Sequence, residues 1–156
     1  PDATGLGLDI SSAAVGIAAQ NATQLALAER AHFGTASFAD DLDAFGIFDL
    51  VICNPPYIPA GELATLAPEV TKFDPARAMD GGKDGLASWR EVLPAIARRL
   101  AADGQAFVEI GAGQQAAVTA IAADCGLSIF QTHADLAGFV RCLGMRHAAA
   151  GVSSGG

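Results

Sequence analysis

Apolar residues follow two alternating patterns along this chain of 156 residues. Short apolar runs fit strands buried within a sheet, and the longer segments between them carry apolar residues at helical spacing. These patterns predict strands at residues 4–9, 36–39, 48–53, 105–110, 127–132 and 139–145, and helices at 12–29, 85–102 and 115–125. Strands that alternate with helices are typical of a parallel sheet covered by helices. The predicted fold class is therefore α/β.

The segments between these elements add detail to the topology. The near-continuous apolar run at residues 48–53 predicts a strand buried on both faces of the sheet. Only residues 135–138 join the last two predicted strands, which is too short for a parallel crossover, so these strands should pair antiparallel. Residues 58–84 lack a regular pattern and are too long for a simple connector, which indicates a functional segment. Pro94 should bend the helix at 85–102 or begin a new one.

The acidic composition restricts the partners that this chain can bind. The formal net charge is −8 and the pI is near 4.6, so the surface repels phosphate backbones. Arg98 and Arg99 form the only adjacent basic pair, which is too few for a nucleic-acid patch. No apolar run approaches the ~20 residues that span a bilayer, and the sequence shows no signal peptide. We expect neither direct nucleic-acid binding nor a membrane partner.

The cysteines and histidines carry no sign of a metal site. Cys53, Cys125 and Cys142 are odd in number, widely separated and set in apolar runs. They fit buried thiols of a reducing compartment, for which the cytoplasm is the default. The three histidines lack partners at the spacing of metal ligands, so we predict structural roles for them and no bound metal.

Four residues that follow the strand at 48–53 carry the clearest chemical signal: Asn54, Pro55, Pro56 and Tyr57. Both prolines fix φ and remove backbone donors, and Pro55 forces the preceding residue toward an extended conformation. The carbonyls of this turn stay free, so the Asn54 oxygen and a neighbouring carbonyl form a pair of acceptors. Such a pair suits an uncharged, planar –NH2 group, as in enzymes that methylate an amide or exocyclic amino nitrogen. A simple proline-rich turn after a strand is the alternative interpretation.

Acidic residues also follow the predicted strands. Asp9 ends the first strand before a helix, where an acid can accept hydrogen bonds from ribose hydroxyls or cap the helix. Asp40 and Asp41 follow the next predicted strand and either contact an adenine or form a solvated turn. Because ligands collect beyond the carboxyl ends of parallel strands, Asp9, Asp41 and Asn54 are predicted to converge. Glu109 ends another strand and either faces this pocket or caps the next helix, with the structural role favoured.

More of the sequence resembles one family of methyltransferases. Besides the Asn-Pro-Pro-Tyr motif, the resemblance is carried by residues 1–4, 8–11, 21–22, 73–86, 107–111 with Gln114, and 135–138 with Arg141. These stretches look like the peptide chain release factor N5-glutamine methyltransferases, which are class I S-adenosylmethionine-dependent enzymes, and the resemblance covers residues 1 to about 146. DNA adenine methyltransferases share the four-residue motif alone, whereas residues 73–86 and 107–111 are more specific.

The resemblance implies an activity and assigns roles to residues. The reaction would be N5-methylation of the glutamine side-chain amide in the Gly-Gly-Gln loop of a release factor, with S-adenosyl-L-methionine as cofactor. Asn54 and the Pro55 carbonyl would hold the amide NH2, while Pro56 and Tyr57 would shape the site around it. Catalysis is therefore assigned to Asn54, Pro55 and Tyr57. Cofactor binding is assigned to Asp9, Ile10, Asp41, Leu42 and Asn54.

One departure from the family pattern limits this expectation. The family has a glycine-rich loop and the central first strand of the sheet just before the position of Pro1, with a helical substrate-binding domain further upstream. We therefore expect residues 1–147 to form a partial, Rossmann-like methyltransferase domain that is mostly parallel, has an antiparallel C-terminal strand pair and is incomplete at its N-terminal end. Residues 148–156 are expected to be a flexible tail. Such a fragment should bind the cofactor weakly or not at all.

Two other functions remain open at this point. One is an N6-adenine methyltransferase that acts on nucleic acid, which the acidic composition disfavours. The other is an inactive, truncated remnant that serves only as an interaction partner.

Overall fold

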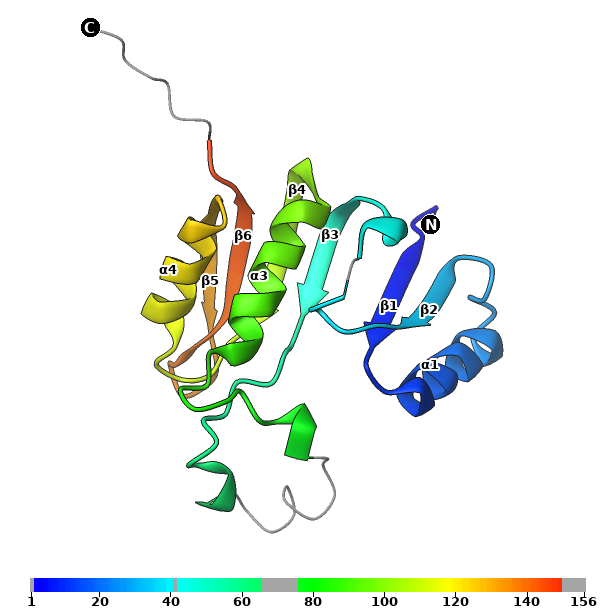
Figure 1. The fold of residues 1–156 in the computed structure, drawn as a ribbon. Coiled ribbons are helices and arrows are strands. Elements are labelled where there is room, and N and C mark those ends of the chain that lie inside the picture. The colour runs from blue at the N-terminus through cyan, green and yellow to red at the C-terminus, as the bar shows by residue number, and fades with distance from the viewer. Residues whose placement is uncertain (1, 41, 66–75, 150–156) are drawn as a thin grey trace, which may run out of the picture. The chain divides into compact units, whose positions relative to one another are not determined.

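The chain forms two compact units, residues 1–42 and 43–156. The structure is a computed structural model that describes residues 2–40, 42–65 and 76–149 (Figure 1). In the described part of the chain, none of the helices is long and apolar enough to cross a membrane.

The first unit contains β1 (Gly5–Asp9), α1 (Ser12–Gln24) and β2 (Ala31–Thr35). The two strands pair in parallel, from Gly5 opposite Ala31 to Asp9 opposite Thr35. Gly7 leaves room for the ring of Phe33 on the neighbouring strand, since a Cβ atom at Gly7 would lie 2.7 Å from the Phe33 Cδ1 atom. This contact agrees with the register, in which Gly7 lies opposite Phe33.

Two predictions in this unit are wrong. The helix predicted to reach residue 29 ends at Gln24, because Ala26 adopts a left-handed conformation (φ 57°) that no α-helix can continue. The strand predicted at 36–39 lies five residues earlier, as β2. Residues 37–40 instead close a turn, in which the Ser37 amide donates to the Asp40 carboxylate (2.7 Å) and the Asp40 amide donates to the Ser37 carbonyl (3.1 Å).

The second unit is a four-stranded sheet with two helices on one face (Figure 1). Its elements, in chain order, are η1 (Asp43–Phe45), β3 (Phe48–Cys53), η2 (Leu63–Thr65), η3 (Ala76–Ala78), α3 (Ala87–Arg99), β4 (Leu100–Glu109), α4 (Gln115–Asp124), β5 (Leu127–Ala134) and β6 (Val140–His147). The spatial order of the strands is β3-β4-β6-β5. The β3–β4 pair is parallel, whereas β6 runs antiparallel to both β4 and β5. The predicted α/β class and the antiparallel pairing of the last two strands are confirmed.

The core of this unit lies between the helices and the sheet. Its largest fully buried side chains are Trp89, Val92, Leu93, Val108, Ile110, Val118, Leu143 and Met145. The helix α3 runs through Pro94 as one element, so the new start predicted there is not found. Buried side chains on both sides of this proline, Val92 and Leu93 before it and Ala95 and Ile96 after it, anchor the helix to the core.

The prediction that β3 is buried on both faces is wrong. Leu50 is 53% exposed and Ile52 is 78% exposed. The register with β4 places Val51 and Cys53 opposite the buried residues Ala106 and Val108, on the face that packs against the helices. Leu50 and Ile52 alternate with them and therefore lie on the other face of what is, within this unit, an edge strand.

Candidate functional site

The loop of residues 54–57 begins where β3 ends and carries the predicted acceptor pair. Asn54 is exposed, Pro55 is buried, and Pro56 and Tyr57 are half-buried. Within the described residues, nothing donates a hydrogen bond to the Asn54 side chain or to the Pro55 carbonyl. Because Pro55 is buried while Asn54 is exposed, the loop is anchored at the proline and its Asn54 side chain lies at the surface of the described part of the chain.

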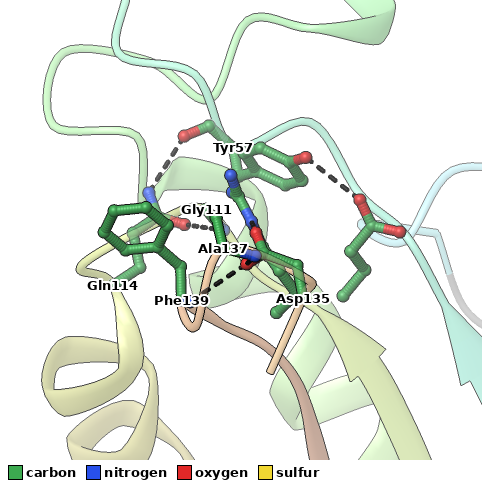
Figure 2. Close-up of polar contacts among 8 residues, drawn as sticks. Tyr57, Gly111, Gln114, Asp135, Ala137 and Phe139 are labelled. Atoms are coloured by element: carbon green, nitrogen blue, oxygen red, sulfur yellow. Dashed lines mark hydrogen bonds and ion pairs between the residues drawn. The ribbon is translucent and has the colours of Figure 1, made fainter. Parts of the chain in front are cut away.

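Tyr57 is held at its hydroxyl end by β4. The hydroxyl donates to the Oε1 atom of Glu109 over 3.0 Å (Figure 2). Burial raises the pKa of Tyr57, the hydrogen bond to Glu109 and the charge of that carboxylate raise it further, and the charge of Arg141 opposes them. The side chain therefore stays a neutral phenol that donates to Glu109. Glu109 faces this site and does not cap the next helix, contrary to the structural role favoured for it.

Tyr57 is held at its backbone by Gln114, whose side chain makes three hydrogen bonds. The Nε2 atom donates to the Tyr57 carbonyl (2.9 Å) and to the Gly85 carbonyl (3.1 Å), and the Oε1 atom accepts from the Gly111 amide (3.0 Å). One carboxamide thus joins the loop after β3, the segment before α3 and the turn after β4. Gln114 thus holds the carbonyl of Tyr57 and Glu109 holds its hydroxyl, and Figure 2 shows these hydrogen bonds as dashed lines.

Three glycines let these segments approach Tyr57 closely. A Cβ atom would lie 2.8 Å from the Tyr57 backbone if placed on Gly81, 2.6 Å from the Tyr57 carbonyl oxygen if placed on Gly85, and 3.1 Å from the Tyr57 ring if placed on Gly111. Backbone pairing supports the same contact, since the Ile58 amide donates to the Met79 carbonyl and the Gly81 amide donates to the Ile58 carbonyl. The glycine-rich stretch at 81–85 is therefore a packing surface for the loop.

A pair of glycine variants tests this packing. Gly85 and Gly113 have similar left-handed backbones (φ 73° and 82°), but only Gly85 is crowded, because a Cβ atom at Gly113 meets nothing within 4 Å. We expect Gly113→Ala to cost about 1 kcal/mol through backbone strain and Gly85→Ala to cost about 3 kcal/mol, because it adds a clash. Urea unfolding followed by circular dichroism measures both, and equal losses for the two variants would contradict the packing.

A second polar cluster ties the β5–β6 turn to the same region. Arg141 donates from Nε to the Oδ2 atom of Asp135 (2.9 Å), while the other carboxylate oxygen accepts from the amides of Ala137 and Phe139 (Figure 2). The hydrogen bond from Arg141 is the largest cause of the lowered pKa of Asp135. The hydrogen bond to Asp135 is the largest cause of the raised pKa of Arg141, and the charges of Asp135 and Glu109 raise it further. The turn is thereby ordered beside the hydroxyl end of Tyr57.

The residues assigned to the cofactor lie mainly in the first unit. Asp9 ends β1 and is exposed, with its Oδ1 atom accepting from the Ser11 amide over 2.7 Å. Ile10 is 61% exposed, and Leu42 is buried. Asp41 lies outside the described residues. The predicted convergence of these residues with Asn54 therefore stays a prediction.

Two residues of this site, Glu109 and Gln114, were not predicted to hold Tyr57. Glu109 was open to a structural explanation, and Gln114 entered only through the family resemblance. The signal available in the sequence was that Glu109 sits at the carboxyl end of the strand at 105–110 and that Gln114 follows in the turn before the next helix, at the same sheet edge as Asn54. In the described ranges, no group of three or more His, Cys, Asp or Glu residues is suited to hold a metal ion.

Comparison with solved structures shows which fold the chain has. A ribosomal protein L11 methylase from Lactobacillus delbrueckii subsp. bulgaricus superposes with a TM-score of 0.64 and 19% identity, covering 93% of this chain and 58% of that one. TrmN from Thermus thermophilus superposes with a TM-score of 0.61 and 13% identity, covering 94% and 37%. The chain has the Rossmann-like fold of the class I methyltransferases.

Curated relatives then identify the family. Release factor glutamine methyltransferase from Rhodospirillum rubrum is 44% identical over 151 residues, which is 97% of this chain and 46% of the relative. The protein of the same name from Bradyrhizobium diazoefficiens is 40% identical over 147 residues, or 94% and 49%. No family model matches the sequence. The chain belongs to the release factor glutamine methyltransferase family, and it spans about half the length of the curated relatives it matches.

Proposed function

We propose that this chain supplies the substrate-amide site of an enzyme that methylates the N5 atom of a glutamine side chain, in the Gly-Gly-Gln loop of a peptide chain release factor. S-adenosyl-L-methionine is the proposed methyl donor and the cytoplasm the proposed compartment. The names of the curated relatives support this substrate class. The observation that carries the proposal is the acceptor pair of Asn54 and Pro55 at the end of β3, to which no described residue donates a hydrogen bond.

The acceptor pair fits an amide better than a charged amine. The Asn54 side-chain oxygen and the Pro55 carbonyl can each accept one N–H of a planar –NH2 group, and neither carries a charge that would demand an ammonium. An amide nitrogen is a poor nucleophile, because its lone pair is delocalised into its carbonyl. Fixing its orientation is therefore the main contribution that this loop can make to the rate. The two acceptors also stabilise the positive charge that develops on the nitrogen during methylation.

The residues that would hold the cofactor fit its ribose. Asp9 is exposed at the carboxyl end of β1, and within the described residues its Oδ2 atom has no hydrogen-bond partner, so it can accept from a hydroxyl. Ile10 follows it with an exposed apolar side chain. When bound, S-adenosyl-L-methionine supplies a methyl group that its sulfonium makes electrophilic. Asp9 and Ile10 would hold the nucleoside, and Asn54 would hold the amide.

Tyr57 acts in this proposal by shape, and it transfers no proton. Its raised pKa keeps the hydroxyl protonated, and the proton is already donated to Glu109. With its hydroxyl and carbonyl both held, the half-buried ring forms a fixed wall at the base of the loop.

The substrate assignment is tested with the whole protein, labelled S-adenosyl-L-methionine and three acceptors. These are a release factor, the same factor with its Gly-Gly-Gln glutamine replaced by alanine, and a double-stranded DNA that contains adenine. We expect label on the first acceptor alone, located by peptide mass spectrometry on the glutamine side chain. Label on the DNA, or equal label on the alanine-substituted factor, would overturn the proposal.

A further inference from the structure

The contacts of Gln114 carry an inference about how the acceptor pair is kept in place. Gln114 is the residue before α4, yet its side chain does not cap that helix. The carboxamide turns toward the loop after β3, where it bonds the Tyr57 and Gly85 carbonyls and the Gly111 amide. It is half-buried, and three of its four hydrogen-bonding positions are used. The Gln114 side chain therefore links three segments of the chain and makes no capping hydrogen bond to the start of α4.

Two neighbouring glycines leave space for the side-chain carboxamide of Gln114. A Cβ atom on Gly85 would lie 2.7 Å from the Nε2 atom of Gln114, and one on Gly111 would lie 2.9 Å from the Oε1 atom. Both glycines thus leave the space that the carboxamide occupies. The donor must also be the end that faces Tyr57 and Gly85, since both groups there are carbonyl oxygens. A carboxylate of the same size would place negative charge against two acceptors.

Because the loop is rigid, the hydrogen bond from Gln114 to the Tyr57 carbonyl also restricts the position of Asn54. Two consecutive prolines separate Asn54 from Tyr57, and both have a fixed φ angle. Anchoring the Tyr57 carbonyl therefore restricts the Pro55 carbonyl and Asn54 as well. We propose that Gln114 is a positioning residue that holds the acceptor pair in register for the substrate amide, an inference that rests on the proposed function. It touches no substrate and acts through Tyr57.

Substituting Gln114 by glutamate removes the donor without changing the size of the side chain. In the whole protein, we expect Gln114→Glu to lower kcat for methyl transfer to a release factor by roughly 10- to 100-fold, because small misplacements of a reacting group are that costly. The KM for S-adenosyl-L-methionine should change by less than about twofold, because uniform cofactor binding is untouched. Gln114→Met, which lacks both hydrogen-bonding groups, should show the same split.

A change of pH separates positioning from a general structural loss. Placed against two carbonyl oxygens, a glutamate at 114 has a pKa above its ordinary value, because its charged form is disfavoured there. When protonated, it can donate to one of the carbonyls. Relative to wild type at the same pH, the activity of Gln114→Glu should therefore recover as the pH falls, whereas Gln114→Met should not recover.

Gln115→Glu is the matched control, with the same substitution one residue later. Gln115 is exposed on the first turn of α4, where a negative charge is favourable. Its kcat should equal that of wild type, and circular dichroism should show folded protein for all the variants. The inference is overturned if wild type methylates the factor and Gln114→Glu and Gln114→Met match Gln115→Glu. Absence of transfer by wild type is a different result, because it refutes the proposed function itself.

Discussion

Replacing Asn54 by alanine is expected to reduce methyl transfer by about a hundredfold or more, the loss typical of removing one oriented polar group from a reacting centre. The fold should survive, since Asn54 is exposed and makes no hydrogen bond to the described residues. The free energy of unfolding should therefore change by less than about 0.5 kcal/mol. Steady-state kinetics of the whole protein measure the first effect, and urea unfolding measures the second.

Two further variants sharpen this result. Asn54→Asp keeps an acceptor oxygen at the same place, so it should retain more activity than Asn54→Ala if accepting a hydrogen bond is the role. The chain has one other asparagine, Asn21, which is exposed on α1, so Asn21→Ala provides the same substitution away from the loop. Normal methyl transfer by Asn54→Ala, or an equal loss of methyl transfer in Asn21→Ala, would contradict the role assigned to Asn54.

Replacing Trp89 by alanine is expected to have the largest effect on stability. Trp89 is fully buried in α3, at the centre of the core between the helices and the sheet. Removing a buried aromatic side chain leaves a cavity and costs about 3–5 kcal/mol. That is a large part of the 5–15 kcal/mol or so by which domains are stable. Because Trp89 is the only tryptophan, unfolding has to be followed by circular dichroism.

A second variant, Trp89→Phe, tests the same prediction and also removes the indole nitrogen of Trp89. Among the described residues, the Nε1 atom has no hydrogen-bond partner. Burying an unpaired donor costs about 1–3 kcal/mol, and both variants remove that cost. Trp89→Phe also keeps most of the buried apolar volume, so it should be far less destabilising than Trp89→Ala, which leaves the larger cavity. Glu91→Ala, at an exposed position of the same helix, is the control and should change little. Equal losses for the two Trp89 variants would contradict this prediction, because cavity size would then not govern the loss of stability.

The loop and the residues packed around it lie within the stretches of sequence on which the resemblance to this family was based. The glycines at 81–85 and Gly111 are the places where backbone and side chain approach Tyr57 most closely. Gln114 and Glu109 then fix the two ends of the same residue. The residues that carry the resemblance therefore include both the acceptor pair and the parts that hold it in place.

Local pattern alone determined most of the secondary structure. The boundaries of β3 were predicted correctly, because a near-continuous apolar run that is followed by two prolines must end before them. The start of α4 and the glycine after it were likewise visible as local signals, and Gly126 has the left-handed backbone (φ 75°) expected after a helix. The acceptor pair was also predicted from sequence, since its chemistry lies in adjacent residues.

Only the tertiary structure decided the features that depend on distant residues. The pairing of β2 with β1 places Phe33 beside Gly7, and the exposure of Leu50 and Ile52 depends on which elements pack on their face of β3. The hydrogen bonds of Gln114 and Glu109 to Tyr57 span 57 and 52 residues of sequence. Such contacts are set by which side chains the packed elements bring within bonding distance. A periodic pattern of apolar residues carries no information about that.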